Sequence, residues 1–349
     1  MMRCFLVLLC ESALGPLDST SRRQSSKVSG ITNAKDKTPR ESDMGSAKRK
    51  LKIESVEPVF GLHWFVGVKD GLFAEEGLDV EIVHPKVPER FSRDDPRRSD
   101  HHKVTSFNYQ NLFEQKQCDV YRACEWGQVR RTYDQQRPGP IVGKRAAIVC
   151  QGIYVRPDSE VNAPGQLAHK EVGVQFHQGS HYTSLAMLEG FLRPDEIKLV
   201  HAGVGWQRFE ALEKGDVEAS CLVAPYNTLA EKKGYKRLCE THYLGLENFA
   251  ADLDAETAQA LDRAIRKAVK NINADKKRYV PILLEEMPEK YRKQITVDDF
   301  FLPRLRYVDP SPYTREEFEH TAEWMKKWDL VPKDASFEKL VENRQHAAA

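Results

Sequence analysis

The stretch from Glu57 to Pro85 constrains the fold of this chain more than any other. It follows Leu51–Val56, where apolar residues alternate, and it contains Leu78–Val83, where apolar and acidic residues alternate, so both segments are predicted to be strands. Between them a turn at Pro58–Gly61 precedes a helical run that stops at Gly77. A strand, a loop, a helix and a second strand form a βαβ unit. Open α/β sheets bind ligands beside loops like its first one, at the carboxyl end of a parallel strand.

The length and composition of the chain set the size of the fold and exclude several classes of partner. The chain has 349 residues, which is enough for two ordinary domains. Its 53 Lys and Arg nearly balance its 52 Asp and Glu, so no basic field indicates nucleic acid. No apolar run approaches the ~20 residues that cross a membrane. The 7 cysteines show no CxxC pair and no zinc spacing, so we expect a reducing compartment and no metal site.

Residues 1–50 are predicted to be a disordered leader. Residues 4–10 form an apolar run after one arginine, barely long enough for the core of a signal peptide. Residues 19–50 are rich in Ser, Lys and Arg and lack aromatic residues, and Met44 offers an internal start. So weak a signal favours a cytoplasmic protein. A secreted or periplasmic location, with a transporter as partner, requires the apolar run to direct export.

Two lobes are expected after the leader. Residues 51–150 begin the first lobe, residues 151–245 form the second, and residues 246–345 return to the first lobe and add C-terminal helices. The return begins with a helix that Asp254 caps and whose apolar residues recur at a spacing near 3.6.

Two shorter segments bear on the site. Lys86–Lys103 is polar and charged, and it is either a solvated insertion or a lid. Phe107–Phe113 is predicted to be a short helix.

Several phrases resemble one protein family. Gly71–Phe73 and Glu75–Val80 resemble the opening of the SsuA-like and thiamine-pyrimidine-synthase-like branch of the periplasmic-binding-protein folds. Pro157–Ser159 is similar to a phrase after the first crossover between lobes in that family, and Gly215–Ala219 is similar to a turn of its second lobe. The resemblance covers residues 51–286. It implies a two-lobed type II α/β fold with a ligand cleft between the lobes and a helical C-terminal segment.

The loops after the predicted strands of both lobes would line that cleft. Aromatic residues on these loops suit a planar or apolar molecule. We expect Ser180 to cap the helix Tyr182–Phe191. The N-terminus of that helix would then lie beside the ligand and favour an anion such as a carboxylate or sulfonate. Glu125 would instead favour a cationic or amine group. The candidate ligand-binding residues are His63, Trp64, Cys124, Glu125, Trp126, Gly179, Ser180, His181, Trp206 and Tyr226.

Cys124 is the sharpest chemical signal, because it stands beside Glu125 at the predicted cleft. A thiol there is a nucleophile or proton donor if His63 or His181 generates the thiolate. The alternative is a buried cysteine at a strand end, with Glu125 in an ion pair with an arginine of the following helix.

The resemblance also narrows the chemistry. The eukaryotic pyrimidine synthases with this fold use a Lys and a His in the loop that matches Ala123–Gly127, together with a run of adjacent cysteines. Here Ala123 and Gly127 stand at those positions and no cysteines cluster, which disfavours a pyridoxal-dependent synthase of the thiamine precursor. The similar aryl sulfinate desulfinases use a Cys in the first loop, where this chain has Glu57 and His63. We therefore expect no cofactor.

Two functions remain open from the sequence. The first is a solute-binding protein that closes on a small organic molecule by hinge motion, and the resemblance implies sulfonates, nitrate, taurine or pyrimidine precursors. The second is a cofactor-independent lyase or hydrolase, of the decarboxylase or desulfinase kind, that uses Cys124, Glu125 and His63. The weak export signal favours the enzyme, and the incomplete catalytic set favours the binder. We expect binding of an aromatic, heteroaromatic, sulfonate-bearing or carboxylate-bearing molecule.

Overall fold

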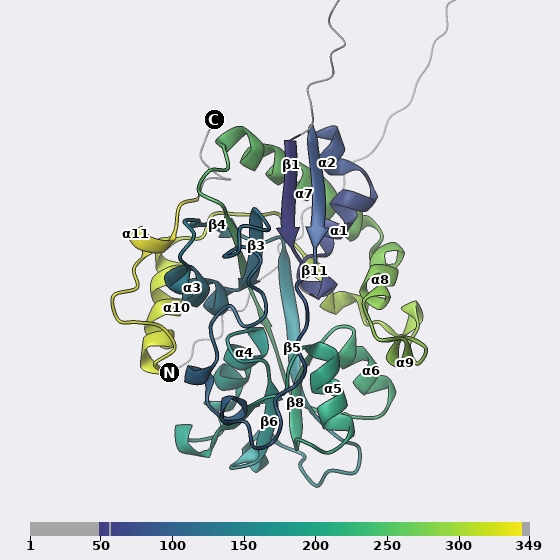
Figure 1. Cartoon of the computed structure of the whole chain (residues 1–349). Helices are drawn as coiled ribbons and strands as arrows, with labels where there is room; N and C mark the ends of the chain where they lie inside the picture. The colour runs from purple at the N-terminus through teal and green to yellow at the C-terminus, as the bar shows by residue number, and fades with distance from the viewer. Residues whose placement is uncertain (1–48, 56, 344–349) are drawn as a thin grey trace, which may run out of the picture. The chain divides into compact units, whose positions relative to one another are not determined.

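The computed structural model describes residues 49–55 and 57–343, in which strands alternate with helices (Figure 1). The strands are β1 (Arg49–Glu54), β2 (Leu78–Val83), β3 (Val120–Cys124), β4 (Ile141–Lys144), β5 (Ala147–Val155), β6 (Glu171–Val174), β7 (Lys198–His201), β8 (Ala219–Val223), β9 (Lys236–Tyr243), β10 (Gly245–Phe249) and β11 (Arg306–Tyr307). The α-helices are α1 (Leu62–Lys69), α2 (Leu72–Glu75), α3 (Glu125–Asp134), α4 (Gly179–Leu188), α5 (Gly205–Glu213), α6 (Tyr226–Lys232), α7 (Ala255–Ala274), α8 (Lys276–Glu285), α9 (Glu289–Arg292), α10 (Arg315–Lys327) and α11 (Phe337–Leu340).

Two mixed sheets form two lobes, as the sequence predicted. The first sheet has the order β2-β1-β3-β10-β4, with β1 parallel to β2 and β3, and β10 antiparallel to β3 and β4. The second has the order β11-β5-β8-β6-β7, and β9 also pairs with β5. In it β6 runs parallel to β7 and β8, while β5 is antiparallel to β8, β9 and β11. The expected leader lies outside the described residues, except that its last two residues begin β1.

The chain passes between the two sheets at neighbouring points. The first crossover joins β4 to β5 through Arg145 and Ala146, and the return joins β9 to β10 through Leu244. The two connections touch, because the Arg145 N–H donates to the Gly245 carbonyl at 2.9 Å. Residues 86–103 and strand β11 also reach the second lobe, through the Arg98–Glu171 pair and the β5–β11 ladder.

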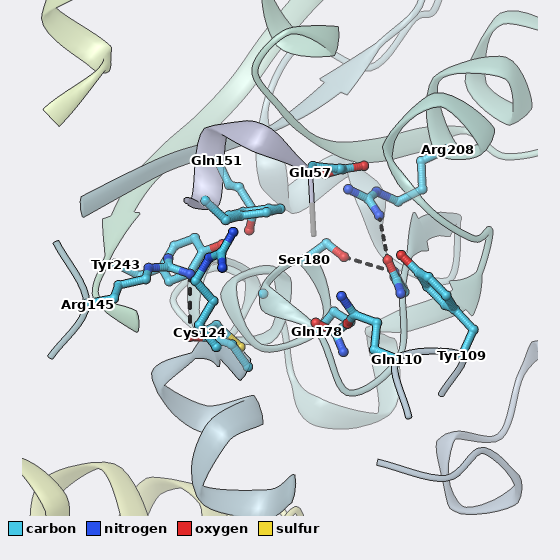
Figure 2. A pocket seen from close by; sticks show the side chains of 15 residues that line it. Glu57, Tyr109, Gln110, Cys124, Arg145, Gln151, Gln178, Ser180, Arg208 and Tyr243 are labelled. Atoms are coloured by element: carbon cyan, nitrogen blue, oxygen red, sulfur yellow. Dashed lines mark hydrogen bonds between the residues drawn. The ribbon is translucent and has the colours of Figure 1, made fainter. Parts of the chain in front are cut away.

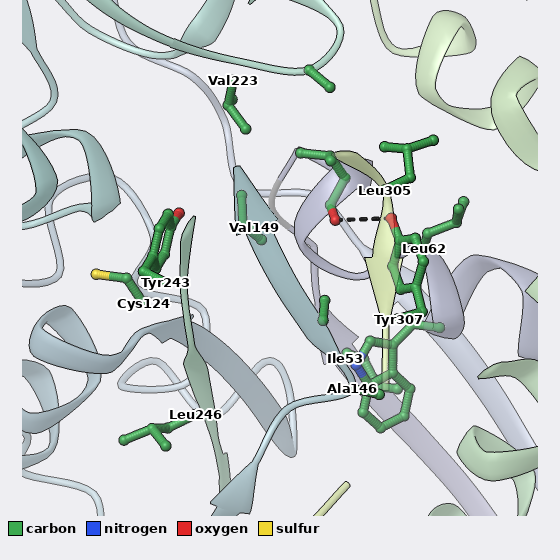
Figure 3. Close-up of a cluster of buried hydrophobic side chains, with 14 of the residues drawn as sticks. Ile53, Leu62, Cys124, Ala146, Val149, Val223, Tyr243, Leu246, Leu305 and Tyr307 are labelled. Carbon is green, nitrogen blue, oxygen red and sulfur yellow. Dashed lines mark hydrogen bonds between the residues drawn. The ribbon is translucent and has the colours of Figure 1, made fainter. Parts of the chain in front are cut away.

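The predicted βαβ unit forms the edge of the first sheet. Ile53 of β1 is completely buried, and Trp64 of α1 stacks on Phe73 of α2 with 5.5 Å between the ring centroids. Figure 3 shows part of the core beside it, where the Tyr307 hydroxyl of β11 donates to the Val59 carbonyl at 3.1 Å. This contact ties the C-terminal part of the chain to the first loop.

The long helix α7 packs against α1 and α2. Its apolar face is buried, as the spacing predicted, and Leu261 and Ile265 are completely inaccessible to solvent. The Asp254 carboxylate accepts from the Thr257 N–H at 2.7 Å, which confirms the predicted cap.

Two local predictions were wrong. Residues 107–113 form turns instead of a helix. Helix α4 begins at Gly179, with Gln178 as its N-cap, because the Ser180 hydroxyl turns back and accepts from the Gln175 N–H at 2.9 Å. Ser180 therefore lies inside the first turn of the helix.

Residues 86–103 pack on the second lobe through charged contacts. Arg98 pairs with Glu171 at 2.6 Å, and Arg90 pairs with Asp216 at 3.2 Å. The His101 carbonyl lies 2.8 Å from the His177 ring nitrogen Nε2. Among the described residues, no helix combines the length and the apolar character that spanning a bilayer requires.

Truncation of Leu261 tests the packing of α7. We expect Leu261→Ala to lower the free energy of unfolding by about 2–5 kcal/mol, because it leaves a cavity in the core. Lys270→Ala, on the exposed face of the same helix, is the control and should change it by less than about 0.5 kcal/mol. Urea unfolding followed by circular dichroism measures both, and equal midpoints would contradict the packing described here.

Candidate ligand site

A cavity of about 430 Å³, counted with its open mouth, is lined by residues from both lobes (Figure 2). We call it the interlobe cavity. The lining consists of Glu57, Phe60, Tyr109, Gln110, Arg122, Ala123, Cys124, Arg145, Gln151, Gln175, Gln178, Gly179, Ser180, Arg208 and Tyr243.

Arg122 brings a buried positive charge to the cavity from β3. The side chain is 2% exposed, and its Nε and Nη2 atoms have no hydrogen-bond partner. Nη1 lies 3.5 Å from the Glu54 carbonyl. Burial lowers the pKa of Arg122 to about 10, with the charge of Arg145 adding to the effect and that of Glu247 opposing it. The group remains a cation at neutral pH.

Arg145 brings a second buried charge from the first crossover. It is 1% exposed, and its Nη2 atom has no hydrogen-bond partner. Its guanidinium donates to the carbonyl oxygens of Ala147 at 3.3 Å and Ala123 at 3.4 Å, and it lies 5.5 Å from the ring centroid of Phe60 and 5.6 Å from that of Tyr243. Figure 2 shows the side chain reaching toward the cavity beside Tyr243.

Two glycines make room for these guanidinium groups. A Cβ atom at Gly61 would collide with the guanidinium of Arg122, and one at Gly245 would collide with that of Arg145. Any other residue at these positions would displace the charged groups, so the backbone itself shapes the cationic side of the cavity.

The opposite side of the cavity is held by Arg208 of α5. Its guanidinium donates to the Cys221 and Gly203 carbonyls, each at 2.9 Å. It also lies 3.5 Å from the Gln175 side-chain oxygen. This network fixes the loop that leads from β6 to α4. Gly179 and Ser180 of the first turn of α4 line the same cavity, and the N–H groups of a helical first turn have no helical carbonyl to bind.

Glu57 lies on this side as well, although it comes from the first lobe. Its carboxylate accepts from the N–H of Gly205, the first residue of α5, at 2.5 Å. Burial raises the pKa of Glu57, and the charge of Arg208 and the Gly205 hydrogen bond oppose the shift. A protein carboxylate thus occupies the N-terminus of α5 and links the loop after β1 to the second lobe.

Of the predicted site residues, Cys124 lines the interlobe cavity together with Gly179 and Ser180. The Cys124 sulfur caps α3 by accepting from the Gly127 N–H at 3.2 Å. Burial raises the pKa of the Cys124 thiol to about 12, so the thiolate needed for nucleophilic attack is scarce at neutral pH.

Glu125 faces away from the cavity lining, toward the C-terminal helices. It accepts hydrogen bonds from the hydroxyls of Tyr313, at 2.8 Å, and of Thr321. Burial raises its pKa, and these two donors oppose the shift. The alternative pairing of Glu125 with Arg130 or Arg131 is wrong, because Arg130 pairs with Asp134 at 2.7 Å and Arg131 pairs with Glu114 at 2.9 Å.

His63 and Trp64 lie in the core behind the cavity. Both side chains are completely buried and contact one Glu247 oxygen, at 3.4 Å from His63 Nε2 and 3.1 Å from Trp64 Nε1. Glu247 stands directly across from Arg122 in the β3–β10 ladder. These two residues therefore support the carboxylate behind Arg122, and neither lines the cavity.

The other predicted residues are divided between the core and a second cavity. Trp126 packs among aromatic rings. Its ring centroid lies 6.0 Å from that of Tyr182 and 5.9 Å from that of Trp324. His181 is buried and accepts from the His177 N–H at 3.3 Å. Trp206 and Tyr226 line a second cavity of about 610 Å³, which shares Glu57 and Tyr109 with the interlobe cavity.

The sequence reasoning missed the three arginines and four glutamines of the lining. Arg122 could have been predicted as a site residue, because an arginine inside a predicted buried strand needs a partner or a function. Arg145 and Arg208 could not have been predicted in this way. The sequence around Arg145 resembles an ordinary connection, and the sequence around Arg208 resembles a solvated helix face. Among the described residues, no group of three metal-ligating side chains includes a member of this lining.

Comparison with known proteins identifies the fold. The sequence matches no protein-family model and no curated protein. The structure resembles the alkanesulfonate-binding protein SsuA of Xanthomonas axonopodis pv. citri, solved bound to MOPS. The TM-score is 0.62 at 14% identity, over 85% of this chain and 98% of that one.

Two further solved structures agree. The Candida albicans protein CA3427, described as having the generic periplasmic-binding-protein fold, gives a TM-score of 0.62 at 12% identity, over 84% of this chain and 96% of its own. DszB in complex with biphenyl-2-sulfinic acid gives 0.56 at 14% identity, over the same shares. At identities this low, the structural similarity establishes the fold alone. It confirms the predicted SsuA-like type II architecture.

The reactivity of Cys124 tests the description of its surroundings. At pH 8 we expect iodoacetamide to modify Cys124 roughly a thousandfold more slowly than a free cysteine, because a pKa of about 12 leaves so little thiolate. Peptide mass spectrometry after timed quenching measures the rate. Unfolding the chain in urea should restore the ordinary rate, and fast modification of the folded protein would contradict a buried, neutral thiol.

Proposed function

We propose that this chain, whose fold is that of the SsuA-like type II periplasmic-binding proteins, binds a small organic anion in the interlobe cavity. The observation that carries the proposal is the pair of buried guanidinium groups of Arg122 and Arg145, which line the cavity with N–H groups unpartnered. A buried charge without a counter-ion is costly. An anion between these groups offsets that cost and accepts their free donors.

The geometry favours an oxyanion head group. Guanidinium groups bind carboxylate, sulfinate and sulfonate oxygens in pairs of parallel hydrogen bonds. The N-terminus of α4 at Gly179 adds free N–H groups and a favourable dipole to the same cavity. SsuA solved with MOPS and DszB solved with a sulfinic acid hold ligands with such head groups, which supports the same class for this chain.

The rest of the lining suits an aromatic or heteroaromatic body. Phe60, Tyr109 and Tyr243 offer ring surfaces, and four glutamine side chains offer amide donors and acceptors. Glu57 provides one acidic group on the Arg208 side of the lining, beside Arg208 in Figure 2. A ligand with an anionic head and a hydrogen-bond donor or amine at its far end therefore matches both sides.

Binding is preferred to the lyase or hydrolase hypothesis because the proposed catalytic groups are engaged elsewhere. The Cys124 thiol caps α3, Glu125 binds Tyr313 and Thr321, and His63 binds Glu247. A nucleophile requires a base within hydrogen-bond reach. Cys124 has no hydrogen bond to a histidine within the described part of the chain.

A ligand screen tests the proposal. Aromatic and heteroaromatic sulfonates, sulfinates and carboxylates should raise the melting temperature in a concentration-dependent way, because they bind only the folded chain. Uncharged analogues of the same shape should have much smaller effects. Differential scanning fluorimetry makes the measurement, and a set of hits confined to neutral or cationic molecules would refute an anion site.

Arg145→Gln tests the residue directly. It removes hydrogen bonds to a charged group that are worth about 1.5–3 kcal/mol, so ligand affinity should fall between roughly tenfold and a hundredfold. The ligand-free variant should melt no lower than the parent, since it loses an unpaired buried charge. Arg193→Gln, at an exposed arginine, is the control and should leave affinity unchanged. Full affinity in Arg145→Gln would remove this residue from the site.

A further inference from the structure

Three potential metal ligands meet on the face of one strand pair, away from the interlobe cavity. Cys150 of β5 stands directly across from His242 of β9, and Glu240 stands across from Gly152. Side chains at directly opposite and next-but-one positions share one face of an antiparallel pair. The Cys150 sulfur, a His242 ring nitrogen and a Glu240 carboxylate oxygen all lie within 4.8 Å of one another.

We propose that Cys150, Glu240 and His242 form a binding site for a divalent transition metal ion, with zinc as the best match. Thiolate, imidazole and carboxylate are the three ligand types that zinc takes in proteins. A thiolate disfavours magnesium and calcium, which take oxygen ligands. Three protein ligands leave a fourth tetrahedral position for water.

The donor atoms are available for this role. The His242 Nε2 atom is buried and has no hydrogen-bond partner. The Cys150 sulfur lies within 4.8 Å of a Glu240 carboxylate oxygen, which is itself a member of the site. The arginine contacts of Glu240, from Arg237 at 3.0 Å and Arg304 at 2.9 Å, both go to the oxygen Oε2. These contacts orient the carboxylate and leave Oε1 without an arginine contact among the described residues.

The nearby arginines are the main electrostatic objection, and a second carboxylate answers it. Glu231 pairs with Arg237 at 3.0 Å and with Arg304 at 2.7 Å. Two carboxylates thus balance the guanidinium groups of Arg237 and Arg304, and Arg306 adds a third positive charge near His242. The thiolate that forms on metal binding then cancels one of the two charges of the metal ion, and hydrogen-bonded carboxylate ligands are usual in zinc sites.

The cluster is partly accessible. Gly152 stands opposite Glu240, and the Tyr154 ring and the Arg237 side chain lie over it. Cys150 is 5% exposed, whereas Glu240 and His242 are only half-buried. Solvent and metal can therefore reach the cluster from one side.

The protonation states set a direction for the pH dependence. Burial and the nearby Glu240 raise the pKa of the Cys150 thiol, while burial and Arg306 lower the pKa of His242. The imidazole is therefore already in its neutral, ligating form at neutral pH, and the thiol has to release a proton to the solvent as the metal–sulfur bond forms. Apparent affinity should rise from pH 6 to pH 8.

The experiment uses the full chain after treatment with a chelator. Cobalt(II) is added as a spectroscopic substitute for zinc. We expect one equivalent to bind with a near-ultraviolet thiolate-to-cobalt band and visible bands of tetrahedral cobalt, and zinc to displace it. Cys150→Ser should abolish the near-ultraviolet band, and His242→Gln should weaken cobalt binding more than tenfold.

A matched control is available on the same strand. Cys239 is the neighbour of Glu240 in β9 and points to the opposite face, so Cys239→Ser should leave the spectrum unchanged. If Cys150→Ser does not fold, X-ray absorption of the zinc-loaded parent protein decides, with one sulfur ligand expected. The absence of a thiolate band in the parent, its survival in Cys150→Ser, or zinc bound by nitrogen and oxygen alone would each overturn the proposal.

Discussion

The candidate site depends on two buried arginine charges that, among the described residues, are not paired to a carboxylate within hydrogen-bond distance. Removing a charged group from water costs several kcal/mol even after the protein relaxes. Arg122 and Arg145 meet only part of that cost through carbonyl contacts and, for Arg122, through Glu247 across the strand pair. The folding free energy of the rest of the chain covers the remainder. A group held at such cost is already positioned for its ligand, so little further ordering is needed when the anion binds.

If the interlobe cavity binds the proposed anion, Arg145 links that binding to the connections between the lobes. Arg145 belongs to the first crossover, and its N–H binds Gly245 at the start of the strand that follows the return crossover. Its guanidinium also lies against Gly245, where no side chain could fit. A ligand that moves this guanidinium pushes on both connections at once. Binding and a change in the angle between the lobes are therefore expected to be coupled mechanically.

The sequence predicted what local periodicity controls and missed what distant segments build together. The βαβ unit, the α7 face and the Asp254 cap follow from spacing within one segment, and all three were predicted correctly. The pairing of Arg145 with Gly245 joins residues that are 100 positions apart, so no local pattern reports it. His63 and Trp64 follow the first loop as expected, but the pitch of α1 turns both of them inward to Glu247.

The two helix N-termini at the cavity explain why the anion should bind on one side. At α5 the Glu57 carboxylate already accepts from the Gly205 N–H. At α4 the Ser180 hydroxyl is used by the Gln175 N–H, and no protein carboxylate lies in the lining beside it. An incoming anion is repelled by Glu57 and attracted by Arg122 and the α4 end. The protein thus fills one of two similar positions with its own carboxylate, and this asymmetry gives a ligand one preferred orientation.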